Sequence, residues 1–252
     1  PEMILMVPLM IETMAKKLEE ASLLPAKIVK NQVFGKQFHT ICSGGAYLDP
    51  KYIDMFKKYG IVIQQGYGMT ECSPVISISQ RWNIRSDSVG QLVPNCEAKT
   101  VDGELWVKGS SVMQGYYRMP EETAETLKDG WLKTGDLGYV DEEGFVYLTG
   151  RKKNLIITKN GENVSPEELE NALSGNRLVG EVLVREKGGV IEAEIYPDQD
   201  YVKRKRVKDV RAALQEVIDA YNRTAAPQKK IYSLIVRDKE FEKTTTRKIK
   251  RF

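Results

Sequence analysis

The sequence predicts three units: the remnant of an open α/β layer over residues 1–79, a small distorted β-barrel over 80–151, and an α+β domain over 152–252. Three changes of pattern support this division. Helical and strand-like apolar runs alternate as far as about Ser79, as in an α/β layer. Short β-like runs separated by glycine turns follow, which is typical of a small barrel. After Arg151, helix-start and hairpin signals are mixed, which indicates an α+β domain.

Composition is that of a soluble enzyme, with 41% hydrophobic and 29% charged residues in a chain of 252. This length allows more than one core. The net charge of +3 argues against a nucleic-acid partner. The chain has three widely spaced cysteines and one histidine, which argues against a disulfide framework and a zinc site. We therefore expect a reducing, cytoplasmic location.

The first unit is read from its apolar runs. The run at 3–11 is too short to span a bilayer and lacks a basic leading segment, so we interpret it as part of the core and expect no integral membrane segment. Residues 50–59 predict a helix that leads into a strand at 61–63. The chain begins with Pro1 rather than methionine, as expected of a piece of a longer protein.

The segment after this strand carries side chains suited to a nucleotide. The carboxyl ends of strands are where α/β sheets bind ligands. Gly66 and Gly68 would let the backbone approach a ligand closely, and Tyr67 offers a flat face to a base. Thr70 offers a hydroxyl to a phosphate, and Glu71 offers a carboxylate oxygen to Mg²⁺. The alternative is a glycine-rich turn around a core tyrosine.

The second unit contains a predicted hairpin with an acid and a base at its open end. Residues 137–140 and 145–148 are apolar β runs joined by an acidic turn that ends in Gly144. Asp136 and Arg151 flank the two runs, so they would project into one region. A carboxylate and a guanidinium so placed could hold the hydroxyls of a ribose. A surface hairpin with an ion pair at its rim fits this segment equally well, and the nucleotide-like segment before it favours the clamp.

The third unit begins with a strand at 155–158 and a turn at Gly161. Ser165 is predicted to cap the next helix, with Pro166 in its first turn and Glu168 completing a capping box. A hairpin at 179–196 and an amphipathic helix over 207–221 follow.

The basic stretch at 203–206 is placed by this pattern at the start of that helix, where cations are unfavourable. We interpret the stretch as a solvated surface. The alternative is attraction for the phosphates of CoA.

The motifs together resemble a known family, the adenylate-forming superfamily of acyl-CoA and aryl-CoA synthetases, luciferases and nonribosomal-peptide adenylation domains. The resemblance rests on the order of seven motifs along nearly the whole chain: Ser-Gly-Gly-Ala at 43–46, Gly-Tyr-Gly-Met-Thr-Glu at 66–71, Gly-Glu-Leu-Trp-Val-Lys-Gly at 103–109, Gly-Tyr-Tyr at 115–117, residues 131–136 with Gly150-Arg151, residues 161–170, and the basic, threonine-rich end at 243–251. The details are most similar to the C-terminal half of a long-chain fatty acid–CoA ligase. The resemblance implies ATP or AMP, Mg²⁺ and coenzyme A as cofactors.

The resemblance also assigns roles to residues that the pattern alone does not mark. It places Gly44, Gly45 and Ala46 beside the adenine and the acyl chain. Lys248 falls where the family has its catalytic lysine, although Arg247 replaces the glycine that usually precedes it.

In the family the C-terminal domain is mobile, and its hinge corresponds here to Lys153. The turn at Gly161 would then let the pantetheine arm of CoA reach the acyl group. Thr70 and Glu71 complete the implied catalytic set with Lys248.

Three functions follow as expectations. The first is an ATP-dependent synthetase that activates a fatty carboxylate as acyl-AMP and transfers it to the CoA thiol. The second passes the acyl group to a carrier-protein thiol instead. The third is an isolated nucleotide-binding fragment without chemistry. The sequence contains no glycine-rich loop with a lysine for a triphosphate, so we expect this chain alone to be inactive in the complete reaction.

Overall fold

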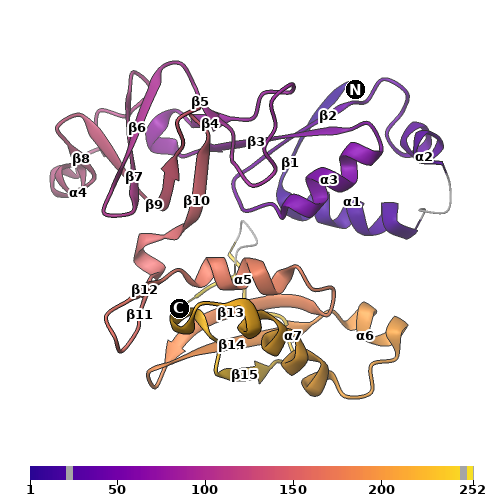
Figure 1. Cartoon of the computed structure of the whole chain (residues 1–252). Helices are drawn as coiled ribbons and strands as arrows, with labels where there is room; N and C mark the ends of the chain where they lie inside the picture. The colour runs from indigo at the N-terminus through magenta and orange to yellow at the C-terminus, as the bar shows by residue number, and fades with distance from the viewer. Residues whose placement is uncertain (21–24, 245–248, 252) are drawn as a thin grey trace. The chain divides into compact units, whose positions relative to one another are not determined.

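The computed structural model describes residues 1–20, 25–244 and 249–251 (Figure 1). The predicted catalytic Lys248 lies outside these residues. Contacts divide the chain into two compact units, Pro1–Leu148 and Thr149–Phe252. Each unit is described by itself below. Within the part of the chain that the structure describes, no helix has the length and apolar composition needed to cross a bilayer.

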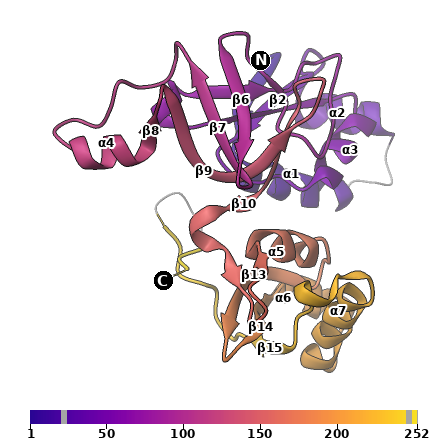
Figure 2. The same cartoon turned by 60° about the vertical axis from the view of Figure 1, so that its left-hand side comes forward.

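The first unit contains a mixed five-stranded sheet with the order β1-β2-β3-β4-β5. The pairs β1–β2 and β2–β3 are parallel, whereas β3–β4 and β4–β5 are antiparallel. Helices α1, α2 and α3 accompany the parallel strands (Figure 2). The bounds are β1 (Met3–Met6), α1 (Pro8–Glu20), α2 (Ala26–Val33), β2 (Thr40–Gly44), α3 (Pro50–Lys58), β3 (Val62–Gly68), β4 (Val75–Ile78) and β5 (Gln91–Leu92).

The helix α3 and its strand confirm the pattern at 50–63. Asp49 caps the helix by accepting a hydrogen bond from the Lys51 N–H at 2.9 Å, and Pro50 occupies the first turn. Phe56 is completely buried in a core shared by α1, α3 and the parallel strands. Ile63 of β3 belongs to the same core, which holds β3 in place against α3.

The interpretation of residues 3–11 as a core segment is wrong for most of the run. Met6 and Ile11 are buried, but the exposed fractions of Met3, Leu5 and Val7 are 55%, 79% and 53%. The reason is topological, because β1 is the edge strand of its sheet and pairs only with β2 among the described strands. Parallel strands are normally covered on both faces. In β1, by contrast, the apolar side chains of Met3, Ile4 and Leu5 are exposed.

The second sheet of the first unit is antiparallel and curled, with the order β10-β9-β7-β6 and β8 paired with β9. It contains β6 (Cys96–Val101), β7 (Glu104–Gly109), β8 (Leu127–Lys128), β9 (Trp131–Val140) and β10 (Val146–Arg151), and α4 (Pro120–Thr126) precedes β8. The predicted hairpin is confirmed as the adjoining ends of β9 and β10. However, pairing with β7 and β8 extends β9 back to Trp131, so Asp136 lies within a strand and not at its end.

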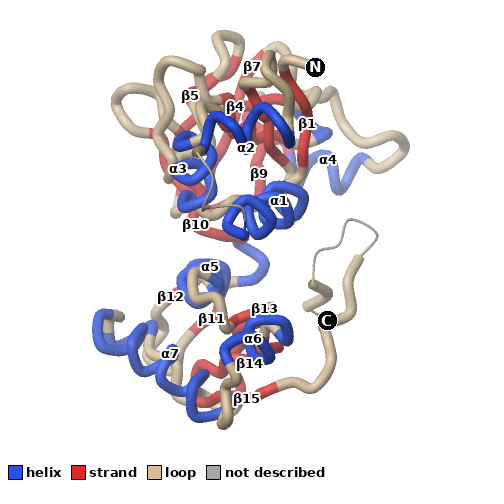
Figure 3. Tube along the Cα trace, turned by 90° about the vertical axis from the view of Figure 1, so that its right-hand side faces the viewer, coloured by secondary structure: helices blue, strands red, loops and turns tan. Residues whose placement is uncertain are grey.

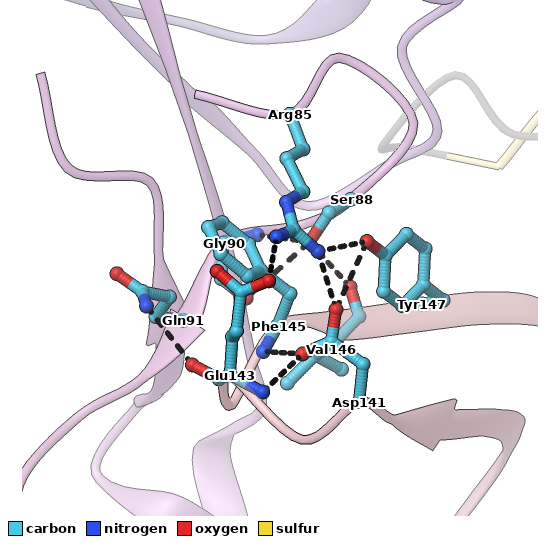
Figure 4. Close-up of polar contacts among 9 residues, drawn as sticks. All are labelled: Arg85, Ser88, Gly90, Gln91, Asp141, Glu143, Phe145, Val146 and Tyr147. Carbon is cyan, nitrogen blue, oxygen red and sulfur yellow. Dashed lines mark hydrogen bonds and ion pairs between the residues drawn. The ribbon is translucent and has the colours of Figure 1, made fainter. Parts of the chain in front are cut away.

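Arg85, in the loop between β4 and β5, binds side chains of the turn of this hairpin (Figure 4). Its guanidinium donates to Asp141 Oδ2 and Glu143 Oε1, both at 2.5 Å, and lies 4.0 Å from the centre of the Phe145 ring. Asp141 also accepts hydrogen bonds from the backbone N–H groups of Glu143 and Phe145. Burial by itself raises the pKa of Asp141, but the Phe145 N–H, the charge of Arg85 and the Glu143 N–H outweigh it. The pKa therefore lies below the ordinary value of 3.8.

Replacing Asp141 with asparagine should lower the free energy of unfolding at neutral pH but not at a pH well below 3.8. A carboxyl whose pKa is lowered in the folded state contributes stability above its unfolded pKa and loses it as the pH falls through the folded value. The free energy of unfolding of the native protein should therefore exceed that of Asp141→Asn at neutral pH, and the gap should close below pH 3.8. Urea unfolding of the native protein and of Asp141→Asn, from neutral pH to below pH 3.8, measures the difference in free energy of unfolding. The control is Glu142→Gln, because Glu142 is exposed. A gap that is independent of pH would contradict the assignment.

The second unit packs helices on one face of a three-stranded sheet with the order β13-β14-β15 (Figure 3). Strands β13 and β14 are antiparallel, and β15 runs parallel to β14. Apolar side chains of α5 and α7 form one core with this sheet. The bounds are β11 (Ile156–Ile157), β12 (Asn163–Val164), α5 (Pro166–Ser174), β13 (Val179–Lys187), β14 (Val190–Pro197), α6 (Gln199–Lys205), α7 (Val210–Thr224) and β15 (Ser233–Val236), with short 3₁₀ turns at Lys152–Asn154 and Pro227–Lys229.

Two sequence predictions for this unit are corrected. Ser165 precedes α5, but its side chain does not cap the helix and instead donates to the Thr149 carbonyl oxygen at 2.7 Å. The basic stretch at 203–206 lies at the C-terminal end of α6, where cations are favourable, and α7 begins later with Asp209 as its cap. The cause is an extra short helix, capped by Asp198, that the pattern merged with α7.

Candidate nucleotide-binding site

The candidate site is built around the end of β3. The sequence placed Gly66 and Gly68 just beyond the strand, but both belong to it and pair with β4. A Cβ atom at Gly68 would overlap the Pro74 carbonyl oxygen, so this glycine is required by the chain itself. Gly44 at the end of β2 pairs with Gly66. The predicted Gly44 and Gly66 segments therefore lie side by side.

Gly45 and Ala46 directly follow Gly44, the last residue of β2. Both are exposed, and Gly45 has a left-handed backbone with φ of +84°. Apart from Gly45 itself and its two chain neighbours, no atom of the described residues lies within 4 Å of the position that a Cβ at Gly45 would occupy. The backbone at the end of β2 is thus open to a ligand.

Tyr67 and Asp136 are brought into direct contact by the two sheets of the first unit. The Tyr67 hydroxyl donates a hydrogen bond of 2.7 Å to Asp136 Oδ2, across 69 residues of sequence. Asp136 is 7% exposed and is held in β9, so its carboxylate has a fixed direction. A buried carboxylate in a defined orientation is suited to accept hydrogen bonds from a diol.

Thr70 and Glu71 lie in a 3₁₀ turn, Thr70–Cys72, directly after β3. Thr70 is exposed and Glu71 is half-buried. The Tyr116 hydroxyl donates to Glu71 Oε1 at 2.8 Å, and the Met113 N–H donates to the Glu71 carbonyl oxygen at 2.8 Å. The loop that contains Tyr116 therefore fixes both the backbone and the carboxylate of Glu71.

Tyr116 belongs to the Gly-Tyr-Tyr motif at 115–117, but no role for its side chain follows from the sequence pattern. Burial, together with its hydrogen bond to Glu71, raises the pKa of Tyr116 above the ordinary value of 10. The phenol consequently remains a donor at neutral pH. The separation of 45 residues between the partners explains why no local pattern could reveal the contact.

With Glu71 as the predicted Mg²⁺ ligand, we expect Tyr116→Phe to weaken Mg²⁺ affinity about tenfold, because loss of a hydrogen-bond partner that orients a ligating carboxylate typically has an effect of about 10–100-fold. The Mg²⁺ dependence of nucleotide binding measures the effect. The neighbouring Tyr117, which is 82% exposed, provides the control Tyr117→Phe. Equal Mg²⁺ requirements in the two variants would exclude a role for Tyr116 in orienting Glu71.

The donor set fits a magnesium ion bound with a nucleotide. Within residues 1–20, 25–244 and 249–251, no three His, Cys, Asp or Glu side chains form a group that could hold a metal. Mg²⁺ usually keeps several waters and is bound by one or two carboxylates together with substrate phosphates. The single oriented carboxylate of Glu71 is suited to such an ion.

The other predicted site residues belong to the second unit. Arg151 ends β10, and Lys153 lies in the short turn that follows; both are exposed. Gly161 lies in the turn between β11 and β12 with φ of +78° and no neighbouring atom within 4 Å of a Cβ position. The clamp formed by Asp136 and Arg151 joins different units, so it stays a prediction, as do the roles of Lys153 and Gly161.

Two family models match the chain. One describes the AMP-binding enzymes and matches residues 1–117, and the other describes the C-terminal domain of AMP-binding enzymes and matches residues 153–252. The chain belongs to this adenylate-forming enzyme superfamily.

Several of the curated relatives are long-chain-fatty-acid–CoA ligases. A long-chain-fatty-acid–CoA ligase of Mycobacterium bovis is 43% identical over 143 residues, which is 56% of this chain and 24% of the relative. A long-chain-fatty-acid–CoA ligase of Bacillus subtilis is 36% identical over 223 residues, which is 83% of this chain and 39% of the relative. The chain therefore spans less than half the length of these relatives.

Solved structures show the same fold. The o-succinylbenzoate–CoA synthetase of Bacillus subtilis in complex with its acyl-adenylate intermediate has a TM-score of 0.78 at 29% identity, over 98% of this chain and 49% of that chain. A structure of the same enzyme with ATP and a magnesium ion has a TM-score of 0.77 at 27% identity, over 98% and 50%. These matches confirm the predicted mixed fold, in which the expected small distorted barrel is a curled half-barrel sheet.

Proposed function

We propose that this chain is the C-terminal part of an ATP-dependent acyl-CoA synthetase, which activates a fatty carboxylate as acyl-AMP and transfers the acyl group to the CoA thiol. The observation that carries the proposal is the pair of contacts on one segment, Tyr67 with Asp136 and Tyr116 with Glu71. They orient one carboxylate for a sugar and another for a metal. The named fatty acid–CoA ligases among the relatives support the choice of substrate and acceptor.

The first half-reaction requires the carboxylate to attack the α-phosphate. In this proposal Asp136 and Arg151 hold the ribose, Thr70 donates to a phosphate, and Glu71 ligates Mg²⁺, which would neutralise phosphate charge. Gly44, Gly45 and Ala46 leave room beside the adenine and the acyl chain. Lys248 then provides a cation between the two anions that must approach one another.

The second half-reaction requires the thiol to reach the acyl carbonyl. We assign this step to a rotation of the second unit about Lys153, which would exchange Lys248 for the turn at Gly161. The missing side chain at Gly161 leaves a path for the pantetheine arm. Thiolate attack would form the thioester and release AMP.

The test is product analysis with a protein that contains this chain together with the remaining length found in the relatives. ATP, Mg²⁺, palmitate and CoA should yield palmitoyl-CoA, AMP and pyrophosphate in equal amounts. If the acyl group is instead transferred to the thiol of a phosphopantetheinylated carrier protein and CoA is not consumed, the acceptor is a protein and the proposed acceptor, CoA, is wrong. No release of pyrophosphate with any carboxylate would overturn the proposal in favour of a nucleotide-binding module. The 252-residue chain alone should form negligible acyl-CoA.

A further inference from the structure

A β-bulge interrupts the pairing of β9 with β7 in the middle of β9. The regular register is lost between Lys133 and Leu137, so that residues 134–136 of β9 lie opposite residue 105 of β7 alone. Gly135, in the middle of the bulge, has a left-handed backbone with φ of +70°. Bulges beside binding sites typically redirect a side chain.

Two side chains form hydrogen bonds with the backbone at this bulge. The Gly135 N–H donates to Glu104 Oε1 at 2.9 Å. The Asp136 N–H donates to Thr134 Oγ1 at 3.1 Å, and the Thr134 hydroxyl donates to the Leu105 carbonyl oxygen at 2.7 Å. Because regular strands are joined by bonds from backbone to backbone, the conformation of this segment depends on the side chains of Glu104 and Thr134.

The carboxylate of Glu104 is buried and held in one orientation. Glu104 and Thr134 are each 3% exposed. The Trp106 Nε1–H donates to Glu104 Oε2 at 3.2 Å, so each carboxylate oxygen accepts a hydrogen bond from a different donor. A buried acid destabilises a fold unless hydrogen bonds compensate it, and an ordinary pair of strands needs none. The position of Glu104 is therefore explained by the bulge that it binds.

Asp136, the last residue of the bulge, carries the buried carboxylate of the candidate site. The carboxylate accepts the hydrogen bond of the Tyr67 hydroxyl at 2.7 Å. Its backbone is held by Thr134, and the preceding Gly135 is held by Glu104. The carboxylate is thus fixed both by a side chain of the first sheet and by the backbone of β9.

We propose that Glu104 and Thr134 are positioning residues for the nucleotide site. They hold the bulge at Gly135 and thereby set the direction in which the Asp136 carboxylate meets the two hydroxyls of a ribose. Neither residue contacts the nucleotide itself. The inference rests on the proposed function, because it uses the role given there to Asp136.

Calorimetric titration of the complete protein with AMP and with 2′,3′-dideoxy-AMP tests the inference. Glu104→Gln and Thr134→Val should each weaken AMP binding about threefold to tenfold, since residues of one hydrogen-bond network are coupled by about this amount. Affinity for 2′,3′-dideoxy-AMP, which lacks both hydroxyls, should stay within about twofold of that of the native protein. Glutamine replaces one acceptor oxygen with a donor, and valine keeps the shape of threonine without its hydroxyl.

Two matched variants accompany this test. Thr134→Ser restores the hydroxyl and should bind AMP within about twofold of the native affinity. Glu97→Gln removes the charge of an exposed acid on β6, in the same sheet, and should leave the affinity for both nucleotides unchanged.

A double-mutant cycle separates positioning from a general loss of structure. In the Asp136→Ala background, Glu104→Gln should cause no further loss of AMP affinity, because the group that Glu104 positions is gone. Independent effects would add instead. Additive losses, or equal losses for AMP and 2′,3′-dideoxy-AMP, would show a merely structural role and overturn the inference.

Asp136→Ala alone separates failure of the inference from failure of the proposed function. If Asp136→Ala weakens AMP binding and neither Glu104→Gln nor Thr134→Val does so, the inference is overturned and the proposed function stands. If Asp136→Ala binds AMP as tightly as the native protein, both fall.

A variant that does not unfold cooperatively in urea is replaced by Trp106→Phe, which keeps an aromatic ring but removes the N–H that donates to Glu104 Oε2. It should weaken AMP binding about twofold to threefold and leave binding of 2′,3′-dideoxy-AMP unchanged. Native affinity of Trp106→Phe for AMP would overturn the proposed positioning.

Discussion

Replacing Lys248 with alanine is expected to lower the rate of acyl-adenylate formation by about 10²–10³-fold, the range seen when one preorganised charge-stabilising group is removed. Thioester formation from supplied acyl-adenylate should remain within about twofold of the native rate. The physical reason is that only the first half-reaction brings a carboxylate against a phosphate. A flexible ammonium offsets that repulsion and the charge that grows in the transition state.

Two assays on the complete enzyme measure this difference. Exchange of labelled pyrophosphate into ATP reports adenylation, and release of AMP from acyl-adenylate and CoA reports thioester formation. Lys250→Ala is the matched control, because Lys250 is exposed and its side chain lies 3.8 Å from Glu242. A similar loss of both half-reactions in Lys248→Ala would contradict the assignment.

Replacing Glu71 with glutamine should reduce adenylation by at least about 100-fold at low Mg²⁺, since loss of even an outer partner of a metal ligand has effects of about 10–100-fold. Glutamine keeps an oxygen that can accept from Tyr116, so the local structure should be preserved while the charge on the ligand is lost. Excess Mg²⁺ should restore part of the rate.

Titration of the adenylation rate with Mg²⁺ tests this expectation. Glu122→Gln, an exposed acid in the first turn of α4, controls for the change in net charge. An unchanged Mg²⁺ dependence in Glu71→Gln would exclude this carboxylate as a metal ligand.

The elements that could be predicted are those whose signals lie within a short stretch of sequence. The helix α3 follows from Pro50 and its cap Asp49, and the hairpin of β13 and β14 follows from Gly188 and Gly189, both with positive φ. Residue types also pointed to Tyr67 and Asp136 as members of one site. Their direct hydrogen bond was not predictable, because it joins two different sheets.

The failures share a cause in tertiary structure. Ser165 has the sequence of a helix cap, but the Thr149 carbonyl oxygen lies within reach and takes its hydroxyl. The apolar run at 3–11 looks like core, but most of it lies on the edge strand β1 or at the start of α1. In both cases the deciding neighbour belongs to another segment, which periodicity cannot reveal.

In the proposed site, Asp136 holds the ribose of an adenylate, and the other nucleotide contacts are assigned around it. Calorimetric titration of the complete protein with AMP, and with a non-hydrolysable acyl-adenylate, tests it most directly when repeated on Asp136→Ala. Loss of a charged hydrogen-bond acceptor is worth about 1.5–3 kcal/mol, so affinity for both ligands should fall by about 10–100-fold. Tyr67→Phe, which removes only the hydroxyl that orients Asp136, should have a smaller effect. If Asp136→Ala binds AMP as tightly as the native protein, the proposed site is wrong.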